Sequence, residues 1–259
     1  MCPVFSLGGV ELHAYALFTA AGAVAACLLA LPALKRAGMT AGQSAAALLL
    51  MCVSFLLGAR LWNVAVNPAN YLGSLQWYTP KLAGLSLYGG VIGAAAALGL
   101  AAKGWKIPLL PLLDGMVIPG GVAFCLARVG CFLNGCCGGK ATGGPFGVVF
   151  PGNEEALPGL LSSLSSRPVH PTQLYELAGA AIGLLAVLLI CSRIRAVPGS
   201  RWLLYLSFLS GVRLAVLPFR ALPYPGVVKQ VVYPLLYAGL MVFGVVWTVR
   251  RNRRGAASR

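Results

Sequence analysis

The chain has 259 residues, of which 59% are hydrophobic and only 10% are charged, and its mean hydropathy is +0.83. Soluble domains carry about 25% charged residues, so the composition excludes an ordinary soluble protein and predicts an all-α integral membrane protein with one polytopic domain over residues 1–259. The formal net charge is +15, but most basic residues flank apolar segments, where they set topology and contact anionic lipid, so nucleic acid is not an expected partner.

Seven apolar runs are long enough to cross a hydrocarbon core of ~30 Å, which takes about 20 helical residues. The third run is short and rich in glycine, which is typical of a broken or partly re-entrant helix. No Lys or Arg precedes the first run, so a cleavable signal peptide is not expected. The seven runs lie at residues 12–34, 44–66, 86–102, 108–130, 173–192, 202–219 and 231–249.

The charges between these runs predict that the N-terminus lies outside and the C-terminus inside. Twelve basic residues then lie in cytoplasmic segments, including a basic tail at 250–259, and five lie in outer segments. The twelve are Lys35, Arg36, Lys103, Lys106, Arg193, Arg195, Arg201, Arg250, Arg251, Arg253, Arg254 and Arg259; the five are Lys81, Lys140, Arg167, Arg220 and Lys229.

The remaining three basic residues, Arg60, Arg128 and Arg213, lie inside apolar runs. An arginine at bilayer depth costs about 2.5 kcal/mol or more, so it is rare without a task. The predicted orientation places all three in the outer half of the membrane, together with the long outer loop at 131–172. We therefore expect a shared anionic ligand and a site that faces the outer leaflet.

Only five acidic residues balance twenty basic ones. Glu154 and Glu155 lie in the outer loop and are interpreted as solvated. Asp114 lies toward the cytoplasm and is expected to form a structural ion pair. Glu176 closes the segment RPVHPTQLYE at 167–176, where a carboxylate at the membrane boundary is costly unless it is paired.

Two prolines bracket His170 in that segment, and Pro171 can occupy the first turn of the fifth span. This places a histidine at the membrane boundary, followed by Gln173, Tyr175 and Glu176 on the first two helical turns. The density of polar side chains favours a site, although a single boundary histidine is usually a hydrogen-bonded interface residue.

Arg213 and Arg220 are seven residues apart, which is two turns along one helical face, although Pro218 interrupts the stretch. Guanidinium groups grip phosphate oxygens in pairs, so two stacked arginines suit a phosphate or a lipid headgroup. The alternative is that Arg220 only anchors the end of the helix at the interface.

Tyr88 precedes two glycines at the entrance of the third run. It is either an aromatic anchor at the interface or a hydrogen-bond donor within the site.

Cys131, Cys136 and Cys137 form a group in the outer loop. A zinc site with His170 as fourth ligand is possible in principle, but adjacent cysteines suit tetrahedral geometry poorly. A disulfide in an oxidising compartment is a second alternative. We favour small side chains that pack a tight loop, and expect no metal.

Taken together, the motifs resemble those of the prolipoprotein diacylglyceryl transferase family of bacterial membrane enzymes. The resemblance covers nearly the whole chain, and its most specific part is HPTQLYE combined with the arginine-led Gly/Asn motif. The matching segments are LHAY at 12–15, GAR at 58–60, SLYGGVIG at 86–93, RVGCFLNGCCGG at 128–139, HPTQLYE at 170–176 and GVRLAVLPFR at 211–220.

The resemblance implies that phosphatidylglycerol enters from the outer leaflet of the bacterial cytoplasmic (inner) membrane. The cysteine thiolate of a prolipoprotein signal peptide attacks the phosphate-bearing carbon of the acylated glycerol. This attack forms a thioether and releases glycerol 1-phosphate. No cofactor is implied. The implied catalytic residues are Arg128, Arg213, Tyr88 and His170. The implied substrate-binding residues are Arg128, Asn134, Gly139, Arg60, His13, Tyr15, Gln173, Tyr175, Glu176 and Arg220.

Two departures from the family pattern remove possible proton acceptors. Tyr88 stands where some members have a histidine, and Leu217 stands where a glutamate often separates the two arginines. If the enzyme deprotonates the thiol, His13, His170 or Glu176 must contribute; otherwise the fields of the arginines lower the pKa of the thiol. The departures leave open a family paralogue with another acceptor, and a non-catalytic phospholipid-binding or translocating protein is a further alternative.

Overall fold

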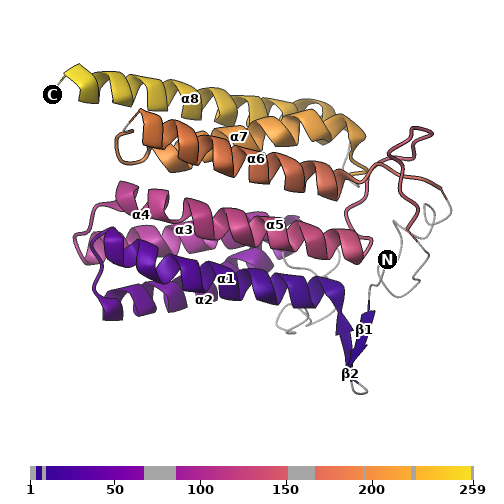
Figure 1. Ribbon diagram of the computed structural model, residues 1–259, viewed down its shortest axis with the longest axis horizontal. Coiled ribbons are helices and arrows are strands. Elements are labelled where there is room, and N and C mark those ends of the chain that lie inside the picture. Colours follow the sequence, from indigo (N-terminus) through magenta and orange to yellow (C-terminus); the bar gives the residue numbers. More distant parts are fainter. Residues whose placement is uncertain are drawn as a thin grey trace. The chain divides into compact units, whose positions relative to one another are not determined.

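The computed structural model describes residues 4–7, 10–66, 86–150, 167–194, 196–222 and 226–257. It divides into two compact units, one formed by Met1–Ala26 with Val117–Arg259 and the other by Cys27–Met116. Apart from a short hairpin, the regular structure is helical (Figure 1).

The elements follow one another along the chain from the N-terminal hairpin to the long C-terminal helix. They are β1 (Val4–Leu7), β2 (Val10–His13), α1 (Ala14–Arg36), α2 (Ala41–Val66), α3 (Leu87–Gly104), α4 (Leu109–Gly115), α5 (Val117–Leu133), α6 (Thr172–Arg193), α7 (Ser200–Val216), the 3-10 turn η3 (Leu217–Phe219), the π turn η4 (Val228–Val232) and α8 (Tyr233–Ala257).

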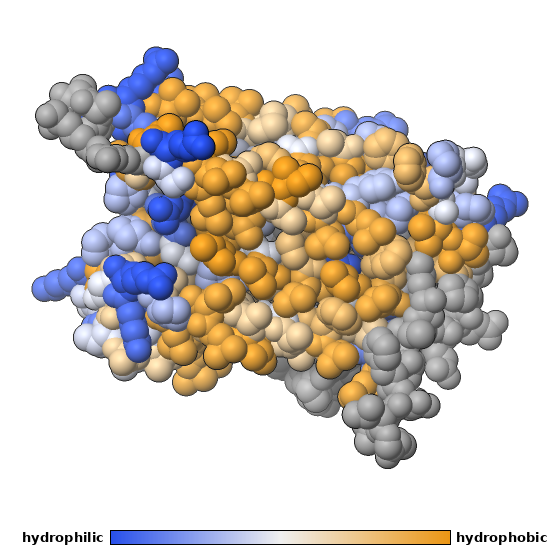
Figure 2. All heavy atoms as spheres, in the orientation of Figure 1, coloured by the Kyte–Doolittle hydropathy of each residue, from blue (hydrophilic) through white to orange (hydrophobic). Residues whose placement is uncertain are grey.

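The predicted class, a helical membrane protein, is confirmed. Among the described residues, six helical segments have the length and apolar character of membrane spans, and Gly89–Gly104 is a shorter apolar helix. The third run is short, as expected, but α3 is one continuous helix rather than a broken one. At most a third of each spanning window is buried within the protein. The visible face of the helices is accordingly covered with apolar side chains, which are suited to contact with lipid (Figure 2).

The first and fourth predicted runs have boundaries that differ from the structure for local reasons. Leu12 and His13 pair with Phe5 and Val4 in the antiparallel hairpin, so the first helix begins at Ala14 rather than at residue 12. The fourth span is divided at Met116 into α4 and α5. Pro119 lacks the N–H group that would otherwise bond to the carbonyl of Gly115, which explains the break.

The second span begins earlier than its apolar run because a capping box starts it. The backbone N–H of Gln43 donates to Thr40 Oγ1 at 3.2 Å, and the N–H of Thr40 donates to Gln43 Oε1 at 2.9 Å. These two bonds satisfy donors that a helix start leaves unpaired. Gly38, with φ of +106°, ends α1 just before this motif.

In the unit of residues 27–116, α2 and α3 pack closely through glycines. A Cβ atom built on Gly58 would collide with the backbone of Gly89, and one on Gly93 would collide with the carbonyl of Ser54. The two backbones can therefore approach only because these positions lack side chains, as is common in membrane helix pairs.

We expect Gly93→Val to separate α2 from α3. Because the added atoms meet backbone rather than a flexible side chain, the substitution should destabilise the protein by about 1–3 kcal/mol, measured as a lower unfolding temperature in detergent. The matched control is Gly104→Val, at the end of the same helix, where nothing lies within 4 Å of an added Cβ. Equal unfolding temperatures of the two variants would contradict this packing.

In the other unit, α5, α6, α7 and α8 pack in chain order. Gly179 and Gly183 on α6 face Val212 and Phe208 on α7. Gly130 on α5 lies against Tyr15 and thus receives the first turn of α1. These contacts bring the ends of α5, α6 and α7 together.

Candidate active site

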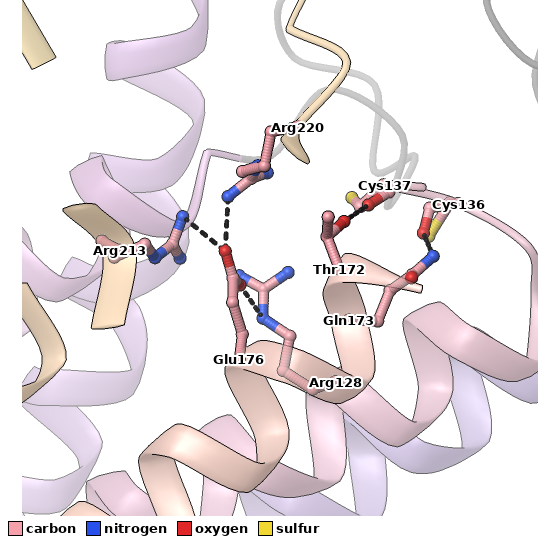
Figure 3. Close-up of polar contacts among 8 residues, drawn as sticks. All are labelled: Arg128, Cys136, Cys137, Thr172, Gln173, Glu176, Arg213 and Arg220. Carbon is pink, nitrogen blue, oxygen red and sulfur yellow. Dashed lines mark hydrogen bonds and ion pairs between the residues drawn. The ribbon is translucent and has the colours of Figure 1, made fainter. Parts of the chain in front are cut away.

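The carboxylate of Glu176 lies at the centre of three arginines (Figure 3). Oε1 is 2.7 Å from Nη1 of Arg220 and 3.5 Å from Nη1 of Arg213, and Oε2 is 2.9 Å from Nε of Arg128. Only 2% of the Glu176 side chain is exposed, and the arginine side chains are between 9% and 15% exposed. We call these four residues the arginine cluster.

Four segments contribute one residue each to the arginine cluster. Arg128 lies on α5, Glu176 on the second turn of α6 and Arg213 on the last turn of α7. Arg220 follows η3 in an extended conformation, with φ −78° and ψ 137°. Arg213 and Arg220 both contact Glu176 Oε1, as their predicted proximity requires. They approach it through the turn η3, which contains Pro218, rather than along one continuous helix.

Gly139 holds the segment that carries Arg220 against the outer loop. Its N–H donates to the carbonyl of His170 at 2.9 Å, and Gly139 forms an isolated antiparallel bridge with Arg220. A Cβ at this position would lie 2.7 Å from Cβ of His170 and 2.5 Å from the carbonyl of Phe219. The glycine is therefore required by backbone crossing, and its predicted contact with substrate stays a prediction.

The arginine cluster carries an excess of positive charge. Three guanidinium groups share one carboxylate, which leaves a net charge of +2 on these four residues. Guanidinium groups stay charged in proteins, so this excess is not removed by deprotonation. Because the groups are poorly solvated, a bound anion would interact with them more strongly than in water.

Phe124 supports two of the arginines and was not predicted from the sequence. The guanidinium carbon of Arg128 lies 4.8 Å from the centre of the Phe124 ring, and that of Arg213 lies 5.8 Å from it. Cation–π contacts of this kind favour a fixed orientation. The available signal was spacing, because residues 124 and 128 lie four apart on one helical face.

The first turn of α6 is attached to the cysteine-containing loop that follows α5. Thr172 Oγ1 donates to the carbonyl of Cys137 at 2.9 Å, and Gln173 Nε2 donates to the carbonyl of Cys136 at 2.6 Å. Both side chains are buried, and Gln173 Oε1 has no hydrogen-bond partner within the described ranges. These bonds fix the turn that precedes Glu176.

Cys131, on the last turn of α5, meets Cys136 and Cys137 of this loop. Hydrogen bonds from Cys131 and Cys136 are the main cause that holds the pKa of the Cys137 thiol well below its usual range, and the fields of Arg128 and Arg220 act in the same direction.

His170 lies in a group of aromatic rings, Tyr175 and Phe219, which immediately precede Glu176 and Arg220 in the sequence. Its Nδ1 is 3.3 Å from the hydroxyl of Tyr175, and its ring centre is 4.9 Å from that of Phe219. The ring is half-buried. The structure thus brings together most of the residues that the motif HPTQLYE contributes, and it joins them to the arginines.

Other predicted site residues take no part in the contacts described above or cannot be compared with them. Asn134 ends α5 and is half-buried, and His13 is exposed at the end of β2. Tyr15 lies on the first turn of α1, against Gly130. Arg60 belongs to the unit of residues 27–116, which is described separately from the unit that contains the arginine cluster. Tyr88 lies on α3, and its side chain is outside the described part of the structure.

Comparison with known proteins agrees with the motifs. The family model of prolipoprotein diacylglyceryl transferase matches residues 3–249. A phosphatidylglycerol–prolipoprotein diacylglyceryl transferase of Pseudoalteromonas atlantica is 30% identical, over 96% of this chain and 90% of the relative. Enzymes of the same name from Clostridium tetani (31%, over 68% of each chain) and Geobacter sulfurreducens (28%, over 83% of this chain and 80% of the relative) are also similar. The chain therefore belongs to the prolipoprotein diacylglyceryl transferase family.

Proposed function

We propose that the protein transfers the diacylglyceryl group of phosphatidylglycerol to the thiol of the lipobox cysteine of prolipoproteins, with release of glycerol 1-phosphate. The observation that carries this proposal is the arginine cluster, in which three guanidinium groups surround one buried carboxylate at the ends of apolar helices. Family membership supplies the reaction, and the cluster supplies the electrostatics that the reaction needs.

The net charge of the arginine cluster suits the change in charge during the reaction. The phosphodiester of phosphatidylglycerol carries one negative charge, whereas a free phosphate monoester carries nearly two at neutral pH. An environment with an excess charge of +2 stabilises the departing phosphate more than the bound lipid. Stabilisation that increases toward the transition state accelerates the chemical step.

In the proposed step, the cysteine thiolate attacks the glycerol carbon that carries the phosphate. A C–S bond forms, the C–O bond to phosphate breaks, and the electron pair of that bond leaves on the oxygen of glycerol 1-phosphate. The guanidinium groups of Arg128 and Arg213 receive this oxygen, and Arg220 contributes to the same field. The thiol proton must leave before or during the attack.

We assign the removal of that proton to His170. Glu176 is not assigned this step, because its carboxylate lies within 2.7–3.5 Å of three guanidinium groups. His170 packs against Phe219, the residue before Arg220, and the hydroxyl of Tyr175 lies within 3.3 Å of its ring nitrogen. A neutral imidazole has one ring nitrogen that can accept a proton, and the neighbouring hydroxyl can fix its tautomer.

The proposed location is the bacterial inner membrane, with the site open to the outer leaflet. The distribution of basic residues, twelve in inner segments and five in outer ones, supports an outer N-terminus. That orientation places the ends of α5, α6 and α7 that meet at the arginine cluster on the outer side. Phosphatidylglycerol and the signal peptide would then both reach the site laterally from the membrane.

The test is a transfer assay with full-length protein in micelles that contain phosphatidylglycerol. A lipobox peptide should gain the mass of one diacylglyceryl group, with one equivalent of glycerol 1-phosphate released. A peptide in which the cysteine is replaced by serine is the control and should remain unmodified. Absence of both products, with lipid movement between leaflets of reconstituted vesicles instead, would support the translocator and overturn the transferase.

We expect His170→Gln to lower kcat by about 100-fold or more, as is common for loss of a general base. The control is Arg167→Gln, an exposed position of the same segment. A His170→Gln variant with the kcat of the control would contradict the assignment of His170 as the base.

A further inference from the structure

Three cysteine thiols meet where α5 ends, Cys131 on its last turn and Cys136 and Cys137 in the loop that follows, and the proposed transfer reaction does not use them. The sulfur atoms of Cys131, Cys136 and Cys137 all lie within 4.8 Å of one another. Cys131 and Cys136 are buried, Cys137 is exposed, and all three are free thiols. We call this group the thiol cluster.

The end of α5 brings the first two thiols together. The N–H of Gly135 donates to the carbonyl of Phe132 at 3.1 Å, and the N–H of Cys136 donates to the carbonyl of Cys131 at 3.0 Å. With Gly135 at φ +73°, these bonds form a Schellman motif. That motif turns the residue after the glycine back against the last helical turn, so Cys136 returns to Cys131.

An unusual backbone conformation brings in the third thiol. Cys137 has φ +63°, a left-handed conformation that residues other than glycine seldom adopt. The buried side chains of Thr172 and Gln173 hold the carbonyls of Cys137 and Cys136 from the start of α6 (Figure 3). Adjacent cysteines suit a tetrahedral metal site poorly, but the left-handed conformation of Cys137 lets its sulfur atom lie within 4.8 Å of those of Cys131 and Cys136.

The spacing of the sulfur atoms suits one shared ion. At the metal–sulfur distance of about 2.3 Å found in thiolate sites, three ligands in a plane lie about 4 Å apart. Within the described residues, the group of possible ligands contains these three sulfur atoms alone. A structural zinc site needs four ligands, whereas soft thiolates select ions such as Cu(I).

We propose that Cys131, Cys136 and Cys137 form a binding site for a soft, three-coordinate cation of the Cu(I) class. Binding replaces the protons that these thiols still carry, which pass to the solvent, and forms three metal–sulfur bonds without a change of oxidation state. The site adjoins the arginine cluster through Thr172 and Gln173, but its existence does not depend on the transfer reaction.

The test is a titration of full-length, reduced protein in detergent with Cu(I), without oxygen and in competition with a chromogenic Cu(I) chelator. The wild-type protein should withdraw one equivalent from the chelator. Cys137→Ser, which alters the exposed member of the thiol cluster, should lower the affinity at least 100-fold, and so should Cys131→Ser and Cys136→Ser. X-ray absorption should show three sulfur neighbours at about 2.3 Å.

Two thiols outside the thiol cluster provide the matched control. The sulfur atoms of Cys27 on α1 and Cys52 on α2 lie 4.0 Å apart. A variant with serine at both positions should still bind one equivalent of Cu(I). Retention of copper by the variant lacking all three cysteines of the thiol cluster would overturn the proposal. Failure of the reduced wild-type protein to bind Cu(I) would also overturn it. A disulfide between two of the three cysteines that persists under these reducing conditions would overturn it as well.

Discussion

The Arg128→Lys variant should lose about 100-fold to 1,000-fold in kcat for diacylglyceryl transfer, although the substitution keeps the charge. Arg128 contacts Glu176 through Nε and lies over the ring of Phe124. A planar guanidinium holds both partners and still points further donors in a fixed direction, whereas an ammonium is a point charge on a flexible stem. Loss of one preorganised donor to a developing oxyanion has an effect of this size.

The measurement is the initial rate of thioether formation at saturating phosphatidylglycerol, so that kcat is separated from KM. The matched control is Arg193→Lys in the last turn of the same helix that carries Glu176, far along α6 from the arginine cluster. This control should have the wild-type rate. If Arg128→Lys were equally active, the phosphate contact that we assign to Arg128 would be wrong.

The Glu176→Gln variant should be strongly destabilised as well as inactive. The amide keeps the shape of the side chain but removes the one carboxylate that three arginines share. Breaking a buried ion pair from one side leaves an uncompensated charge and typically costs about 3–5 kcal/mol. We therefore expect a lower unfolding temperature in detergent and a smaller folded fraction.

A second substitution tests whether the instability of Glu176→Gln comes from its unbalanced charge. In Glu176→Gln/Arg220→Gln the net charge of the four positions returns to +2, so part of the lost stability should return while the activity should not. The single variant Arg220→Gln completes the double-mutant cycle. If the stability losses of the two single variants simply added, Glu176 and Arg220 would not be coupled, against the 2.7 Å contact between them.

The membrane architecture could be predicted from the sequence because it follows from local composition. A run of apolar residues must be helical in lipid, since its backbone groups have no other partners there. The boundaries were less accurate where another local rule prevailed. Thr40 and Gln43 start α2 early by capping it, and Pro119 divides the fourth span.

Most residues of the candidate site could also be identified from the sequence. Arg128, Arg213, Arg220 and Glu176 were each expected to take part. Their mutual arrangement was not, because the spacing between α5, α6 and α7 depends on contacts such as Gly183 with Phe208. Phe124 and Thr172 were missed because an aromatic residue and a threonine in apolar segments are unremarkable until their neighbours are known.

The amino-acid sequence alone determined the helical membrane fold, the family resemblance and the excess of basic residues over acidic ones. Only the tertiary structure decided that three arginines share one carboxylate, so that the arginine cluster retains a charge of +2. It also decided that three cysteines meet at one point. The physical reason is range: hydrophobicity and helix capping act between near neighbours in the chain, whereas Arg128, Glu176 and Arg220 become neighbours only when separate helices pack.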